Sequence, residues 1–164
     1  MNTLIIIAMT LLFGYTLTVC VVNRGVPSSL SATVYALPPM GAWLWTFIIG
    51  AVSGLTLPVI LETAPDDWAF LAFIAIVGLL FVAVCPLVPD KGEMTYKIHI
   101  GGAVVCAVCS QLLIAVTEPK LLLLWIPWAI AYVWITTKDG KWKQATFWAE
   151  MTCFVGTFIL CLSN

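Results

Sequence analysis

Charged residues are scarce in this sequence, and their scarcity limits what the protein can be. They make up 9% of the 164 residues, with a formal net charge of −1, whereas a soluble domain usually carries about 25%. So little charge cannot cover a water-exposed surface, and we therefore expect most of the surface to face lipid. The few basic residues lie between apolar runs and create no extended positive field, which excludes a nucleic-acid-binding groove.

Histidine is almost absent as well, because His99 is the only one. A catalytic zinc site usually takes three protein ligands. The chain has no HExxH motif, and the CxxC of Cys106 and Cys109 has no second cysteine pair at metal-site spacing. A phosphate-binding glycine loop is missing too. We therefore predict no metal site and no cofactor.

The usual serine-hydrolase motif is also missing. A Ser–His–carboxylate set could be assembled from a serine of residues 28–31, His99 and an acidic residue, but no GxSxG sequence frames any of these serines. An intramembrane hydrolase is therefore a minor alternative, and a non-enzymatic role is favoured. The six cysteines lie in or beside apolar runs, where cysteine behaves as a small hydrophobic residue, so we predict free thiols.

Long apolar runs, by contrast, are abundant. A helix that spans a bilayer needs about 20 mostly apolar residues, and the sequence offers six candidates. The fifth is short, and it either forms a tight hairpin with the fourth or crosses a locally adjusted bilayer. We predict an all-α, polytopic integral membrane protein in which residues 1–164 form one bundle of about six transmembrane helices. The predicted spans are 3–22, 40–60, 68–86, 98–117, 121–136 and 144–162.

The first span could be mistaken for a cleaved signal sequence, and the loop after it contains signals for a short helix. The span lacks the positively charged start of a secretory signal and is longer than the apolar core of one, so we expect a retained helix rather than a lipoprotein signal ending at Cys20. In the loop 23–39, Pro27 and the two serines after it predict the cap of a short helix that runs through Tyr35. We expect this helix to lie at the interface or to fold back toward the bundle.

Basic residues are distributed unevenly among the loops. Six of the seven follow the first, third or fifth span, while Lys120 stands on the other side among acidic residues. Because positively charged loops remain in the cytoplasm, this asymmetry predicts a multi-pass protein of the cell inner membrane with both termini outside. The six are Arg24, Lys91, Lys97, Lys138, Lys141 and Lys143.

Two of the predicted spans carry a stripe of polar and small residues on one helix face. The stripe residues recur at spacings of three and four, which places them on the same side of a helix. We expect both stripes to point into the bundle. They are His99, Ala103, Cys106 and Ser110 in the fourth span, and Thr146, Glu150, Cys153 and Thr157 in the sixth.

A third stripe, in the first span, consists of Thr10, Gly14 and Thr18. Small residues allow helix backbones to approach closely in a bilayer. We therefore expect this stripe to be a helix-packing face.

Glu150 and His99 are the most informative polar residues. A carboxylate about seven residues inside a span is expensive unless it is paired, protonated or hydrated. Glu150 therefore either hydrogen-bonds a neighbouring helix or lines a polar pocket, and His99 is its natural partner. His99 in turn either bridges helices at the interface or acts as a proton carrier or a ligand for a phosphate headgroup.

These observations lead to one main hypothesis and two alternatives. We expect a polar pocket inside the bundle, near one membrane face, that binds or senses a lipid or a small polar ligand. The alternatives are an oligomeric channel or effector whose pore is lined by Glu150, and a membrane scaffold or accessory subunit with a partner protein. The predicted pocket residues are His99, Glu150, Cys106, Ser110, Cys153 and Thr157, with Asp90, Lys91 and Lys97 at its mouth.

The run CPLVPDKG…YKIHIGGA has a proline-acidic loop that ends one helix and a histidine that opens the next. It resembles the corresponding loop of the DUF998 and Frag1/DRAM/Sfk1-like six-helix membrane proteins. The serines of the first loop and the acidic residue of the last span look similar too, although the family's phenylalanine before the proline is replaced here. The resemblance implies a six-helix bundle associated with lipid sensing or lipid remodelling. Carried over by position, it points to Pro89, Asp90, His99, Glu150 and Ser31.

Overall fold

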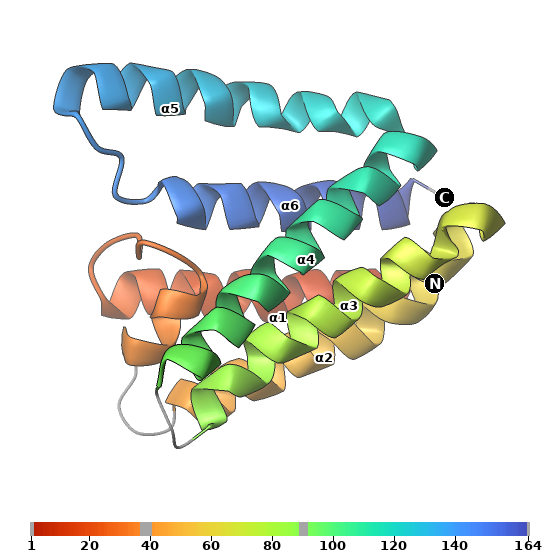
Figure 1. Ribbon diagram of the computed structural model, residues 1–164, viewed down its shortest axis with the longest axis horizontal. Coiled ribbons are helices and arrows are strands. Elements are labelled where there is room, and N and C mark those ends of the chain that lie inside the picture. The colour runs from red at the N-terminus through yellow and green to blue at the C-terminus, as the bar shows by residue number, and fades with distance from the viewer. Residues whose placement is uncertain (1, 37–40, 89–91, 164) are drawn as a thin grey trace.

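The computed structural model describes residues 2–36, 41–88 and 92–163, and all regular structure in this part of the chain is helical. Six α-helices follow one another in an up-and-down order (Figure 1). Short 3-10 segments adjoin several of them: η1 is Ser31–Ala36, η2 is Asp66–Trp68, η3 is Cys85–Leu87 and η4 is Pro119–Leu124. The α-helices are α1 (Asn2–Val22), α2 (Gly41–Thr63), α3 (Ala69–Val84), α4 (Glu93–Thr117), α5 (Trp125–Asp139) and α6 (Ala145–Leu162).

All six predicted spans are confirmed as helical segments that are long and apolar enough to cross a membrane. The fifth is longer than the sequence pattern suggested. Its 3-10 segment η4 begins two residues after the end of α4, at Pro119, and leads into α5, so the helical segment Pro119–Asp139 has 21 residues instead of 16. The predicted shortness of this span is therefore wrong, because the 3-10 segment already begins at Pro119 and α5 continues through Asp139.

The helices form two unequal parts joined by α4. Helices α1, α2 and α3 pack side by side, and α4 packs most extensively against α3 before it crosses the bundle toward η4 (Figure 1). Helix α6 contacts α1, α2 and α4. Helix α5 lies at the edge and has no buried residue. Both ends of the chain lie at the same end of the bundle, as the predicted topology requires (Figure 1).

Glycines set the closest helix contact, which is between α3 and α4. A Cβ atom added at Gly78 would lie 2.7 Å from the carbonyl oxygen of Gly102, and a Cβ atom added at Gly102 would lie 2.7 Å from that of Gly78. The two backbones therefore touch where neither residue has a side chain. This pair fixes the position of α4, and with it the position of His99 and Cys106.

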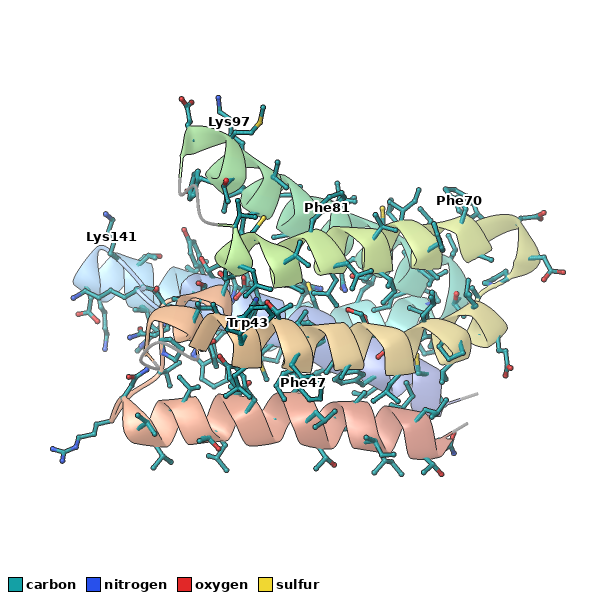
Figure 2. All side chains as sticks on the ribbon, turned by 90° about the horizontal axis from the view of Figure 1, so that it is seen from below. Trp43, Phe47, Phe70, Phe81, Lys97 and Lys141 are labelled. Carbon is teal, nitrogen blue, oxygen red and sulfur yellow. The ribbon has the colours of Figure 1, made fainter. Side chains whose placement is uncertain are left out.

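Large apolar side chains cover the outside of the bundle. Trp43 and Phe47 project outward from α2, and Phe70 and Phe81 project outward from α3 (Figure 2). Trp43 and Phe47 are 68% and 69% exposed. An apolar perimeter of this kind suits hydrocarbon and not water, as the low charge content predicted.

The stripe Thr10, Gly14 and Thr18 of α1 lies on this outer surface, and the two threonine hydroxyls bond to carbonyls of their own helix. Its predicted role as a packing face is therefore wrong within this chain. The buried face of α1 is instead formed by apolar residues such as Ile5, Leu12 and Val19.

Candidate functional site

The first loop folds back into the bundle, as one of the two predicted arrangements required. Its 3-10 helix η1 begins at Ser31, and the Ser29 hydroxyl accepts a hydrogen bond from the Ala32 N–H at 3.1 Å. Leu30 and Thr33 are buried. The hydroxyls of Thr33 and Tyr15 of α1 are 2.8 Å apart, so a polar contact anchors the loop to α1.

Glu150 holds the same loop from the side of α6. Its Oε2 atom accepts a hydrogen bond from the Leu30 N–H at 2.6 Å. One turn earlier in α6, the Phe147 N–H donates to the carbonyl oxygen of Ser28 at 3.1 Å. The partner of Glu150 is thus a backbone group of the loop, and no ion pair joins it to His99 within the described residues.

Helices α4 and α6 are neighbours, so their polar stripes do face a common region. This region is divided into three adjoining cavities. We call them the loop cavity, the central cavity and the hydroxyl cavity, in order from the loop end of the bundle inward. The single predicted pocket is therefore a row of smaller spaces that share wall residues.

The loop cavity has a volume of about 340 Å³. It lies between the first loop, the end of α3 and the start of α4. Its polar wall consists of Ser29, Ser31, Thr95, Tyr96 and His99. His99 and the two serines thus share one space, although no hydrogen bond joins His99 to either serine in the described part of the chain.

The central cavity has a volume of about 160 Å³ and lies deeper, between the loop and helices α2, α3, α4 and α6. Its wall is mainly carbon, with Trp45, Leu79 and Phe154 among the larger side chains. Glu150 is the only ionisable carboxyl group in this wall. Ser31 lines both the central and the loop cavity, so the two spaces adjoin at that residue.

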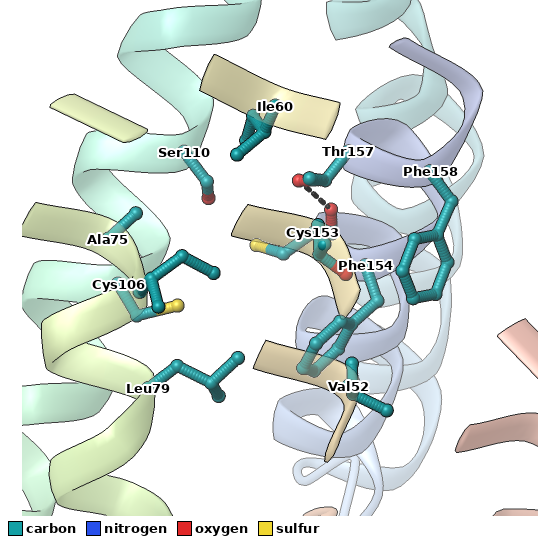
Figure 3. Close-up of a pocket in the computed structure, with 12 residues that line it drawn as sticks. Val52, Ile60, Ala75, Leu79, Cys106, Ser110, Cys153, Phe154, Thr157 and Phe158 are labelled. Carbon is teal, nitrogen blue, oxygen red and sulfur yellow. Dashed lines mark hydrogen bonds between the residues drawn. The ribbon is translucent and has the colours of Figure 1, made fainter. Parts of the chain in front are cut away.

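The hydroxyl cavity has a volume of about 50 Å³ and lies deepest. Ser110 projects into it from α4 and Thr157 from α6, with Cys106 and Cys153 between them and the central cavity (Figure 3). Thr56 of α2 completes the polar part of the wall. Both cysteines line the central cavity as well, so the central and hydroxyl cavities follow one another along the α4–α6 interface. The loop cavity has no wall residue from α6 and adjoins the central cavity at Ser31.

The structure distributes the sequence-predicted residues over these cavities. His99 lies in the loop cavity, Glu150 in the central one, and Ser110 and Thr157 in the hydroxyl cavity. Lys97 lies apart on the exposed surface, where its Nζ atom is 2.7 Å from Glu93 Oε1. The other two predicted mouth residues, Asp90 and Lys91, lie outside the described residues, as does Pro89 of the family resemblance.

Three contributors to the site were not singled out from the sequence. The Leu30 N–H binds Glu150, Trp45 forms part of the central wall, and Thr56 adds a third hydroxyl to the deepest cavity. Thr56 follows Ser53 by three residues on α2, so helical spacing carried some signal for it. The sequence gives no such signal for the Leu30 N–H, because it is a backbone group.

All six cysteines are free thiols, as predicted. No group of three or more histidine, cysteine or acidic side chains is arranged to hold a metal ion in the described part of the chain. The chemistry of the three cavities is therefore that of hydroxyls, thiols, one imidazole and one carboxyl group.

Comparisons with protein-family models, with curated proteins and with solved structures found no match to this chain.

Proposed function

We propose that this chain is an integral membrane protein that binds one amphiphilic molecule between the first loop, α4 and α6. The polar headgroup would occupy the loop cavity, and part of the apolar chain would occupy the central cavity. The observation that carries the proposal is the shared wall at Ser31, which joins a polar space at the loop end of the bundle to a carbon-lined space deeper in the bundle.

The loop cavity suits a headgroup because hydroxyl and imidazole groups converge on it. Ser29, Ser31 and Tyr96 can donate or accept hydrogen bonds, and His99 can donate one or, when protonated, two. The basic residues in the loops at this end of the bundle favour an anionic headgroup, such as a phosphate or a carboxylate.

The central cavity limits how much of an apolar chain can enter. A space of about 160 Å³ is smaller than the pockets that enclose drug-sized ligands, which measure about 300–1,000 Å³. A stretch of one acyl chain fits, and a whole two-chain lipid does not. The remainder of the ligand would lie along the outer surface of the bundle.

Glu150 acts in this proposal as a positioning residue. By accepting the Leu30 N–H at 2.6 Å, it fixes the residue directly before Ser31. The wall that separates the two cavities is thereby held in place. A change at Glu150 would alter ligand retention by moving the loop, even if the carboxyl group never touches the ligand.

The test is native mass spectrometry of the purified protein in mild detergent. We expect the wild-type protein to retain one lipid-like molecule per chain, and His99→Ala and Glu150→Leu to lose most of it. Lys97→Ala is the matched control, because Lys97 lies on the same helix as His99 but lines none of the three cavities. Retention by His99→Ala together with loss by Lys97→Ala would refute the cavity site.

The two alternatives make different predictions in the same samples. An oligomeric channel lined by Glu150 predicts a multimer of fixed stoichiometry and a conductance in liposomes that Glu150→Gln abolishes. A scaffold for a partner membrane protein predicts variants of lower stability and no retained molecule in the wild type. We favour ligand binding because the Glu150 carboxylate is occupied by a hydrogen bond within its own chain. The lipid-related role implied by the resemblance to Frag1/DRAM/Sfk1-like proteins agrees with it.

A further inference from the structure

A fourth cavity lies between α5 and α6, beside the turn that joins them at the loop end of the bundle (Figure 1). We call it the α5–α6 cavity, and its volume is about 390 Å³. Thr146 and Ala149 of α6 separate it from the central cavity, because both residues line both spaces. Tyr132 on the α5 side is 42% exposed, so the α5–α6 cavity opens to the outside of the bundle.

Three aromatic rings form one side of this cavity. Trp128 and Tyr132 of α5 stack with their ring centroids 5.2 Å apart, and the Trp142 ring of the turn lies 6.3 Å and 6.4 Å from them. The Trp128 indole N–H donates to the Ala145 carbonyl, at the start of α6, at 3.0 Å. The rings are therefore held together as one wall that connects both helices with the turn.

The charged residues beside this cavity differ in what they contact. Lys138 is occupied by an aromatic ring, since its Nζ atom lies 4.3 Å from the centre of the Trp134 ring. Lys143 and Asp139 are exposed and do not line the cavity. Lys141 does line it, from its place in the turn (Figure 2), and forms no ion pair within the described residues. One free positive charge is therefore directed to this space.

The free polar groups of the wall are mainly hydrogen-bond donors. The Lys141 ammonium and the Trp142 indole N–H can only donate, and the Tyr132 hydroxyl can donate as well. The indole N–H and the phenol hydroxyl have no hydrogen-bond partner in the described part of the chain. None of the described wall residues is a carboxylate. An ammonium ligand is disfavoured because Lys141 repels it and because Trp128 and Tyr132 cover each other's facing surfaces. The wall therefore suits an anion.

We propose that the α5–α6 cavity binds the phosphate group of a membrane lipid, at a second site separate from the loop cavity. Lys141 would bind the phosphate oxygens, Trp142 and Tyr132 would donate to the headgroup, and the acyl chains would stay in the bilayer beside α5. Ligand pockets measure about 300–1,000 Å³, and this cavity falls in that range. A lipid is favoured over a free anion because tryptophan and tyrosine rings prefer the headgroup level. The inference shares with the proposed function only the placement of the chain in a membrane.

The test is a titration of the purified full-length chain with dioleoylphosphatidylglycerol in mild detergent, followed by native mass spectrometry. Lys141→Gln should raise the Kd of one bound lipid about fivefold. Lys143→Gln is the matched control, because it removes the same charge from the same turn but from outside the cavity, and we expect little change. Equal losses in the two variants would overturn the proposal. The titration is repeated in the His99→Ala variant, where the Lys141-dependent lipid should persist. A bound lipid that His99→Ala removes and Lys141→Gln leaves would overturn this second site alone.

Three further comparisons identify what is bound. Trp142→Phe keeps a ring but removes the indole N–H, so it should also weaken binding, whereas Trp134→Phe, outside the cavity, should not. Dioleoylglycerol has the same acyl chains without the phosphate and should not bind the wild-type protein at this site. Binding of dioleoylglycerol as tight as that of the phospholipid would overturn the role of the phosphate. Inorganic phosphate in large excess should leave the lipid bound, and its displacement would overturn a lipid as the source of the phosphate.

Discussion

At the scale of single residues, Glu150 shows how an acidic side chain can stand inside an apolar helix. It accepts a hydrogen bond from a backbone N–H whose residue, Leu30, is 2% exposed. A hydrogen bond to a charged group contributes about 1.5–3 kcal/mol, against about 0.5–1.5 kcal/mol for a neutral pair. Without Glu150, the Leu30 N–H would be buried and unpaired. The carboxyl group therefore stabilises the folded-back loop whatever the cavities bind.

Two substitutions at Glu150 should separate the hydrogen bond from the charge. Glu150→Leu removes the acceptor and leaves the Leu30 N–H unsatisfied, which costs about 1–3 kcal/mol. Glu150→Gln keeps an acceptor oxygen and should cost clearly less. Thermal unfolding in detergent measures both, at about 2–4 °C per kcal/mol for a chain of this size. Equal losses in the two variants would mean that the charge, and not the acceptor, holds the loop.

The sequence identified the costly residues but not their partners. Glu150 and His99 stood out because polar groups are rare and expensive inside apolar spans. The sequence paired them with each other because both lie near the same membrane face. The partner of Glu150 depends on how residues 23–36 fold back, and no side chain of that loop marks the Leu30 N–H as a donor to α6.

At the scale of helices, the contact of Gly78 with Gly102 determines where α4 lies. No side chain separates the two backbones at this point. In a bilayer, lipid tails are as apolar as leucine, so close packing of this kind supplies much of the helix association. The same contact determines which face of α4 turns toward α6, because Cys106 lies one turn after Gly102.

A pair of adjacent glycines provides a controlled test of this contact. Gly102→Ala places a Cβ atom 2.7 Å from the Gly78 carbonyl oxygen and 3.0 Å from the Phe81 Cβ atom, so α3 and α4 must move apart. Overpacking typically costs about 1–3 kcal/mol. A Cβ atom at Gly101 meets nothing within 4 Å, so Gly101→Ala should gain up to about 1 kcal/mol from helix propensity. Opposite signs of the two Tm shifts are expected, and two gains would refute the contact.

The ends of the helices could be predicted from the sequence wherever the length of an apolar run determined them. All six predicted spans agree with the helical segments, because about 20 apolar residues leave few alternatives in a bilayer. The fifth span was underestimated because Pro119 and Lys120 signal a helix end, whereas the structure continues through them as η4. The sequence also could not predict the three-way division of the α4–α6 region, since side chains of α2, α3 and the loop form its partitions.

At the scale of the whole molecule, charge is separated along the bundle axis. The turns that follow α1, α3 and α5 lie at one end, and both termini lie at the other (Figure 1). By sequence position, the first end carries six basic and three acidic residues, a balance of +3. The second end carries one basic and four acidic residues, a balance of −3, and Glu150 lies between them. The loop cavity lies at the positive end, which is why an anionic headgroup fits the proposed function.

This separation predicts one orientation in a bacterial inner membrane, with the positive end in the cytoplasm. Alkaline phosphatase fused after Asn164 should be active, and green fluorescent protein fused there should be dark. The same reporters inserted at Gly140, which ends α5 in a left-handed conformation, should give the reverse pattern. Lys141→Gln should leave this orientation unchanged, because the positive end keeps five of its six basic residues. A fluorescent C-terminal fusion would contradict the charge argument and would place the loop cavity on the outer face.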